Sequence, residues 1–141
     1  MSVNNSKPFQ HRAVAAGVTK ALIRDVIHDF YGKVRQDVML GPIFENAIGG
    51  NWDRHIEKVI LFWTTATRLD TGYKARNFMP AHMRHASIGT EQLSRWLSLF
   101  QETLAERCAP DTSDVLFEIA ERMAENIRVG LSNRDAQLPR A

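Results

Sequence analysis

The chain has 141 residues, 44% of them hydrophobic and 24% charged, and its 18 lysines and arginines exceed its 16 acidic residues by a formal charge of +2. These values are typical of one folded domain and exclude a disordered chain. The basic residues are interspersed with acidic ones, so nothing indicates a nucleic-acid partner. The single cysteine, Cys108, excludes an internal disulfide and a cysteine-built zinc site, and it favours a reducing cytoplasm.

The first predicted helix follows a polar leader. Residues 1–17 are expected to be flexible and lack the apolar stretch of a secretory signal or a membrane span. Between Val18 and Gln36, apolar residues recur every three or four positions, which predicts an amphipathic helix with one buried face. In the segment DVMLGPIF that follows, Gly41 and Pro42 are expected to force a turn.

A second helix is predicted from about Trp52 to Leu69, where apolar residues again fall on one face. A short helix should come next, because Pro80 is tolerated only in a first turn and Gly89 can close the helix. Thr90 then has the side chain of an N-cap, and we expect it to begin a third long helix.

The fourth long helix is predicted to begin after Pro110, where the residues from Asp111 to Asp114 offer several capping side chains. It should stop near Gly130, before a polar tail. No segment shows the alternation of a strand, and no repeat is present. The sequence therefore predicts an all-α architecture of four long helices with short connectors.

Four residues on these helices could belong to a site or to an ordinary core. Tyr31, on the apolar face of the first helix, is most simply a core tyrosine whose hydroxyl bonds to a neighbour. His55, near the start of the second helix, is most simply a surface or capping residue. Trp63 and Trp96 are by default core filler, because large aromatic side chains dominate core burial.

The spacing along the second helix favours a pocket over a core. An imidazole tops an otherwise apolar stripe at positions i, i+4, i+7 and i+8: His55, Val59, Phe62 and Trp63. The stripe is about 12 Å long at ~1.5 Å per residue. A polar group buried without a partner costs about 1–3 kcal/mol, so something polar should meet the imidazole.

Two more histidines, His82 and His85, lie in the segment MPAHMRHASI. One imidazole cannot build a structural zinc site, which needs four ligands. A porphyrin supplies four nitrogens itself and requires only one imidazole and a flat apolar slot. The two side chains are about 60° apart on a helix of 3.6 residues per turn, so both cannot point at one iron atom.

Several strings, in their order and spacing, resemble the group III truncated haemoglobins of bacteria over roughly residues 18–130. As a set they are specific, although any one of them would be weak. They are FYGKVRQDVMLGPIFENAIG at 30–49, WDRHIEKVILFW at 52–63, MPAHM at 79–83 and LSRWLSLFQETL at 93–104. The resemblance implies a truncated globin fold, a two-over-two helical sandwich around a b-type haem. It also implies a globin domain over residues 18–131 with a flexible tail at 132–141.

The resemblance also assigns roles to individual residues. It makes His82 the proximal ligand to the haem iron, and His85 is then expected to face a propionate or solvent. On the distal side, where a gas ligand binds, it places Tyr31, His55 and Trp96. The haem pocket is completed by apolar side chains that wedge or line it: Phe44, Val59, Phe62 and Trp63.

The function implied by the resemblance is high-affinity binding of O2, NO or CO at a pentacoordinate iron. Chemistry on NO or reactive oxygen species, or sensing, is favoured over transport. One alternative is a haem-dependent NO dioxygenase or peroxidase that needs an external reductase. An alternative of another class is a cofactor-free all-α module that binds a partner helix in its apolar groove. A monomer or weak dimer without a membrane partner is expected.

Overall fold

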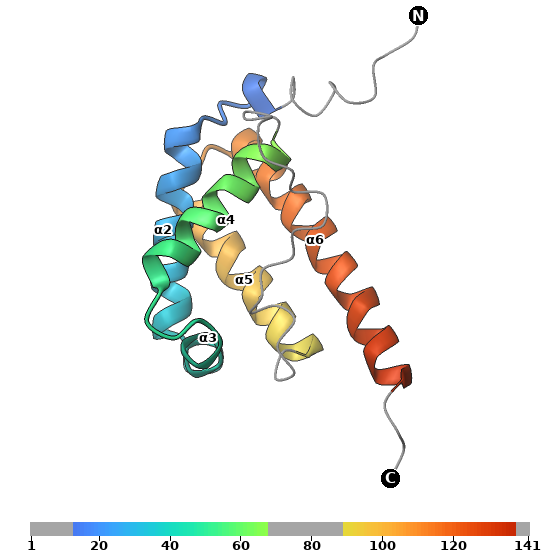
Figure 1. The fold of residues 1–141 in the computed structure, drawn as a ribbon. Coiled ribbons are helices and arrows are strands. Elements are labelled where there is room, and N and C mark those ends of the chain that lie inside the picture. The colour runs from blue at the N-terminus through green and yellow to red at the C-terminus, as the bar shows by residue number, and fades with distance from the viewer. Residues whose placement is uncertain (1–12, 68–88, 138–141) are drawn as a thin grey trace, which may run out of the picture.

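The computed structural model describes residues 13–67 and 89–137, and their side chains as far as Gly130. These ranges are helical and contain no strand, which confirms the all-α prediction. The short helix led by Pro80 lies outside the described residues, as do His82 and His85. The elements in chain order are α2 (Lys20–Gln36), α3 (Leu40–Ile48), α4 (Trp52–Ala66), α5 (Thr90–Arg107) and α6 (Pro110–Gln137) (Figure 1).

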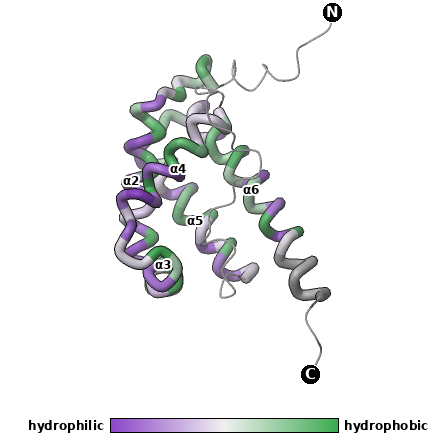
Figure 2. The backbone as a smooth tube through the Cα atoms, in the orientation of Figure 1, coloured by the Kyte–Doolittle hydropathy of each residue, from purple (hydrophilic) through white to green (hydrophobic). Residues whose placement is uncertain are grey.

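The long helices are arranged in two pairs. α2 contacts α4, and α5 contacts α6 (Figure 1). α2 also packs against α5, so this contact joins the two pairs, and α3 lies at the end of α2 with contacts to both α2 and α5. Hydrophobic and hydrophilic residues alternate along the helices in the pattern expected of one buried face (Figure 2). The described helices thus form the predicted two-over-two arrangement.

α2 begins and ends close to its predicted limits. Thr19 is its N-cap, and the threonine hydroxyl accepts a hydrogen bond of 3.1 Å from the N–H of Leu22. Asp37 has extended backbone and ends the helix. The buried face consists of Ile23, Val26, Ile27, Phe30, Tyr31 and Val34.

The segment after α2 corrects the sequence prediction, because it forms α3 where only a turn was expected. Pro42 lies in the first turn of α3, where a helix tolerates a residue without an N–H. Gly41 is needed for close approach and not for a turn, since a Cβ atom there would lie 2.7 Å from the carbonyl oxygen of Arg35. The two residues that were interpreted as helix breakers therefore allow α3 to start directly beside the end of α2.

The ends of α4 and α5 differ slightly from prediction. α4 stops at Ala66, three residues before the predicted limit at Leu69. Gly89 is the N-cap of α5, and Thr90 is the first helical residue, so the predicted N-cap was wrong by one position. The Gly89 N–H donates a hydrogen bond of 2.9 Å to the side-chain oxygen of Gln92, which satisfies the N–H of the N-cap residue.

α6 is longer at both ends than the sequence predicted. Its first residue is Pro110, so the capping candidates from Asp111 to Asp114 lie inside the first turns and do not cap the helix. The helix continues through Gly130, because one glycine costs only about 1 kcal/mol in a helix interior and cannot end it alone. None of the described helices is both long and apolar enough to cross a membrane.

Residues 13–17 of the predicted leader pack against the helices. Ala13 is buried, and its carbonyl oxygen accepts a hydrogen bond of 2.9 Å from the N–H of Val18. The Thr112 hydroxyl on α6 donates a hydrogen bond to the carbonyl oxygen of Ala16. These contacts tie the chain before α2 to the start of α6.

Candidate functional site

A layer of aromatic rings joins α2, α4 and α5. The Phe100 ring stacks on Trp63 at 5.1 Å between centroids and on Trp96 at 6.0 Å. Phe30 meets Phe100 and Trp96 edge-on, at 5.1 and 5.6 Å. All four side chains are buried. Trp63 and Trp96 therefore both contribute to the hydrophobic core, which is the simpler of the two roles considered for them from the sequence.

Tyr31 lies next to this layer and faces α3 and α4. Its side chain is 1% exposed, and its ring meets the His55 imidazole edge-on at 5.5 Å between centroids. The Phe44 ring of α3 lies 6.3 Å away. The predicted distal residues His55 of α4 and Trp96 of α5 thus both lie beside Tyr31 of α2. We call these three residues the distal cluster.

The Tyr31 hydroxyl keeps its proton at neutral pH. Burial raises the pKa of Tyr31 far above its ordinary value, and the nearby Trp96 side chain opposes only part of that rise. A protonated phenol can donate one hydrogen bond and accept others. Tyr31 is therefore a permanent hydrogen-bond donor in this cluster.

His55 is held in its neutral form. Burial, with a smaller contribution from the positive charge of Lys58, lowers the pKa of His55 from 6.5 to about 4. The Nε2 atom is buried, although the residue as a whole is only partly buried. A neutral imidazole has one donor and one acceptor nitrogen, which lets His55 meet either kind of group.

Trp96 supplies a second donor. Its buried Nε1–H makes no hydrogen bond of full geometry among the residues that the structure describes, and the acceptor it approaches is the Tyr31 hydroxyl. The indole still lies near enough to the Tyr31 hydroxyl to lower that group's pKa. A buried N–H left without a partner costs about 1–3 kcal/mol. The distal cluster therefore holds a tyrosine O–H, a tryptophan N–H and a neutral imidazole, a set that suits a small hydrogen-bond acceptor.

The apolar residues predicted for the pocket divide into two groups. Phe44 is fully buried against Tyr31, and Val59 is buried on the same face of α4 as His55. Phe62 is only half-buried, and its ring lies 6.0 Å from that of Trp63. Phe44 and Val59 thus accompany the distal cluster, whereas the other two lie further along α4.

Three residues that the sequence interpretation did not assign to the site lie beside it. The Trp52 indole is 6.2 Å from the Tyr31 ring and donates a hydrogen bond of 2.9 Å to the Glu45 carboxylate. The Arg35 guanidinium lies over the Trp52 ring, 4.6 Å from its centroid. Trp52 could have been found, since it is three residues before His55 and shares its helix face.

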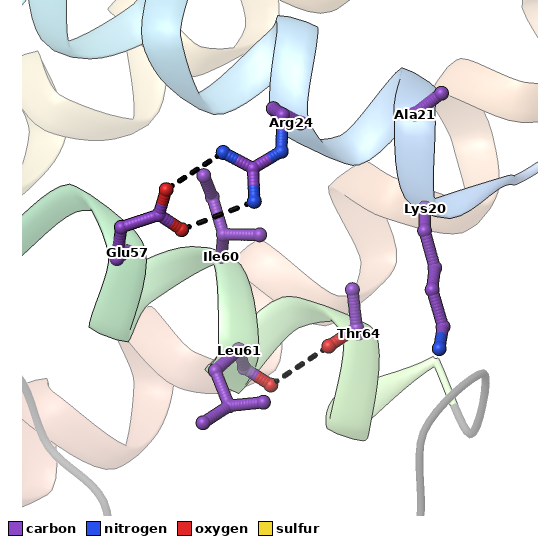
Figure 3. A pocket seen from close by; sticks show the side chains of 7 residues that line it. All are labelled: Lys20, Ala21, Arg24, Glu57, Ile60, Leu61 and Thr64. Atoms are coloured by element: carbon purple, nitrogen blue, oxygen red, sulfur yellow. Dashed lines mark hydrogen bonds and ion pairs between the residues drawn. The ribbon is translucent and has the colours of Figure 1, made fainter.

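A separate pocket lies between α2 and α4, on the other face of α4 (Figure 3). At about 100° per residue, Ile60 and Thr64 point away from His55 and Phe62, so the pocket contains none of the predicted site residues. Arg24 and Glu57 form a bidentate pair at its rim, with bonds of 2.7 and 3.1 Å. Its volume is about 550 Å³, and its lining is Lys20, Ala21, Arg24, Glu57, Ile60, Leu61 and Thr64.

The described residues hold no group of three or more histidine, cysteine, aspartate or glutamate side chains that could bind a bare metal ion. The order and packing of the helices around the distal cluster define a truncated globin fold, as the sequence predicted.

Comparison with known proteins agrees with this fold. No family model matches the chain. The curated group 3 truncated hemoglobin ctb of Campylobacter jejuni is 29% identical over 114 residues, which cover 79% of this chain and 89% of the relative. The crystal structure of the group III truncated hemoglobin from Campylobacter jejuni matches with a TM-score of 0.68 at 30% identity, covering 80% of this chain and 91% of that one. The chain belongs to the group III truncated haemoglobin family.

Proposed function

We propose that this chain binds haem b, with His82 as the ligand to the iron, and holds O2 on the side of the distal cluster. The observation that supports this most directly is the pair of buried donors, the Nε1–H of Trp96 and the O–H of Tyr31, which lie side by side with neutral His55 next to Tyr31. Haem would supply an iron atom that can bind O2, NO or CO. The donors present fit a gas ligand that accepts hydrogen bonds.

The distal residues then determine how tightly the ligand is held. Tyr31 donates its O–H, because burial keeps the phenol protonated, and Trp96 donates its N–H. Each such bond contributes roughly 0.5–1.5 kcal/mol, and two together slow ligand escape by roughly one to two decades. Neutral His55 stands beside Tyr31 and can hold the phenol in place or bond to the ligand itself.

Slow release suits retention or chemistry of a diatomic molecule better than delivery. We therefore favour NO or reactive oxygen chemistry, or sensing, over transport. Turnover as an NO dioxygenase or peroxidase would draw electrons from an external reductase. We further propose that residues 18–131 form the globin domain, as a monomer or weak dimer, and the single Cys108 supports a reducing cytoplasm as its compartment.

Replacing Tyr31 with phenylalanine tests the distal assignment, because it removes one oxygen atom and keeps the ring. We expect Tyr31→Phe to raise the O2 dissociation rate several-fold in stopped-flow exchange against CO. Trp52→Phe is the matched control, because the Trp52 indole already donates to Glu45. Loss of that indole should leave the O2 dissociation rate nearly unchanged. An unaltered rate in Tyr31→Phe would show that the hydroxyl does not face the ligand.

The proximal assignment is tested by two single variants. We expect His82→Ala to lose tight haemin binding and the native Soret band, whereas His85→Ala should keep both. The reverse pattern would make His85 the ligand. A wild-type protein that takes up no haemin at all would instead favour the cofactor-free interaction module.

A third experiment separates binding from catalysis. The reduced, oxygen-saturated protein is mixed with NO in a stopped-flow instrument, and nitrate is measured with and without an added reductase. Nitrate in excess of the protein concentration, only with the reductase, supports an NO dioxygenase. One equivalent or less under both conditions supports storage or sensing.

A further inference from the structure

The carboxylate of Asp37 lies where α2 ends and α3 begins. Its Oδ2 atom accepts hydrogen bonds from the N–H groups of Met39 and Leu40, at 3.1 and 3.0 Å. Its backbone carbonyl accepts a third bond, of 2.9 Å, from the N–H of Gly41. Asp37 therefore caps the first turn of α3 while it terminates α2.

The other carboxylate oxygen reaches α5. Oδ1 of Asp37 accepts a hydrogen bond of 2.8 Å from Nε of Arg95, and a second guanidinium nitrogen lies 2.7 Å away. The Asp37 side chain is only 6% exposed, although the Arg95 side chain is 45% exposed. Burial favours a raised pKa for Asp37, but the bonds from Arg95 and Leu40 outweigh it and hold the pKa below its ordinary value.

These contacts connect the helices that carry three residues of the proposed ligand side. Tyr31 lies less than two turns before Asp37 on α2, and Phe44 is one turn after the capped start of α3. Trp96 directly follows Arg95 on α5. A single carboxylate thus bonds to α3 and α5 at the end of α2 from which these side chains project.

The remaining ion pairs between α2 and α5 lie at the opposite end of the contact. Asp29 accepts a bond of 3.3 Å from Nε of Arg107, and Lys33 pairs with Glu106. Neither pair involves a residue near Trp96 in the sequence. On the Trp96 side of this helix pair, Asp37 and Arg95 form an ion pair.

We propose that Asp37 is a positioning residue: through Arg95 and the first turn of α3 it sets where the Trp96 indole N–H and Phe44 stand relative to the Tyr31 hydroxyl. That these groups face a bound gas ligand rests on the proposed function, whereas the positioning itself does not.

Two variants separate the ion pair from the cap. Asp37→Asn keeps a side-chain oxygen for the N–H groups of Met39 and Leu40 and removes the charge that Arg95 meets. Arg95→Gln removes the pair from the partly exposed side and leaves the cap intact. If Asp37→Asn does not fold, Arg95→Gln still tests the proposal.

The readout is the Trp96 indole N–H resonance in a proton–nitrogen correlation spectrum of the purified protein, assigned with Trp96→Phe and recorded CO-saturated where haem is bound. We expect both variants to shift this resonance and to raise the O2 dissociation rate several-fold. The double variant should do no more than either single change, because the two residues act through one contact. An unmoved resonance in both variants, with only a lower melting temperature, would overturn the proposal.

Arg107→Gln is the matched control, because it removes an ion pair between the same two helices away from Trp96. It should leave the Trp96 resonance in place. If Asp37→Asn shifts the resonance while Tyr31→Phe leaves the O2 rate unchanged, the positioning stands and the proposed function fails. If Tyr31→Phe raises the O2 dissociation rate while Asp37→Asn and Arg95→Gln leave the Trp96 resonance unmoved, the proposed function stands and the positioning is wrong.

Discussion

The distal cluster and the pocket between α2 and α4 both contain polar side chains beside an apolar floor, but they differ in burial. In the distal cluster, Tyr31 and Trp96 are 1% and 3% exposed, and burial shifts the pKa of Tyr31. At the pocket, Arg24 and Glu57 are about half-exposed, at 50% and 55%, and bond to each other. Arg24 and Glu57 at the pocket are open to water, whereas Tyr31 and Trp96 in the distal cluster are enclosed by protein.

This difference shows why the volume of a hollow is a poor guide to function. Polar groups in contact with water lose little when they have no ligand, so an exposed ion pair carries no implication about binding. A buried donor without a partner is costly, and its presence points to a group that accepts its hydrogen bond. Burial therefore favours the distal cluster as the proposed site, although the separate pocket has a volume of about 550 Å³.

The largest expected effect on stability comes from the aromatic layer under the distal cluster. Phe100 contacts Phe30, Trp63 and Trp96 and is 1% exposed. Phe100→Ala should lower the free energy of unfolding by about 3–5 kcal/mol, because it leaves a cavity between rings that cannot collapse. Urea unfolding of the purified variant measures this loss.

Leu61→Ala is the corresponding change at the pocket, where the side chain is only partly buried. Its loss in the same urea experiment should be well below that of Phe100→Ala, because water already reaches the surface that the leucine covers. Equal losses in the two variants would show that the two regions do not differ in packing as argued.

A second, smaller effect is a pH dependence carried by His55. The unfolded chain protonates this imidazole as the pH falls below 6.5, whereas the folded chain does so only near pH 4. The unfolded state therefore binds more protons in this window, so stability should decline as the pH falls from 6.5 to 4 and be fully present above it. His55→Gln should flatten that part of the stability curve.

Lys58→Gln provides the check on this cause, because the Lys58 charge helps to lower the pKa of His55. Its removal should raise the midpoint of the His55 imidazole resonance in an NMR titration and narrow the pH window. A midpoint in the wild type close to the ordinary value of a histidine would contradict the buried environment.

The two buried indoles of Trp96 and Trp52 should differ in how much they contribute to stability. Trp96→Phe removes an N–H that makes no hydrogen bond of full geometry among the described residues, which offsets the lost apolar contact, so stability without added haem should change by less than about 1 kcal/mol. Trp52→Phe removes an N–H that donates to Glu45 and should cost more. Denaturant unfolding of both variants decides this, and a larger loss in Trp96→Phe would mean that its indole is already bonded.

The smallest effect is expected at the rim of the pocket. Arg24→Gln removes the bidentate pair with Glu57, but both side chains are exposed to water, and such pairs contribute little to stability. Its melting temperature should equal that of the wild type within error, in low and in high salt. A clear drop that disappears in high salt would show that this pair holds α2 to α4.

The helices that carry a regular apolar face were predictable from the sequence. α2 and α4 begin within two residues of their predicted starts, because helical periodicity and capping are local properties. α3 was missed, since Gly41 and Pro42 have the local signature of a turn and only the backbone of α2 beside them shows why they suit a helix start. The predicted end of α6 at Gly130 was also wrong, because one weak helix former does not stop a long helix.

The site was predicted in part. The stripe on α4 drew attention to His55 because a polar group topped an apolar face, and resemblance to the family assigned roles to Tyr31 and Trp96 and added Phe44. The ion pair between Asp37 and Arg95 and the contact of Trp52 with Glu45 could not be foreseen, because each joins two different helices. The part of the prediction that concerns His82 lies outside the described residues.

By itself, the amino-acid sequence determined which faces of the helices are apolar and which residue types could serve a ligand, because spacing along a helix dictates which side chains share a face. Only the tertiary structure decided that Tyr31 on α2 and Trp96 on α5 meet in a buried space where neither is in contact with water. The reason is physical: a phenol and an indole behave as ordinary surface or core groups until packing removes water from around them, and that packing depends on all the helices together.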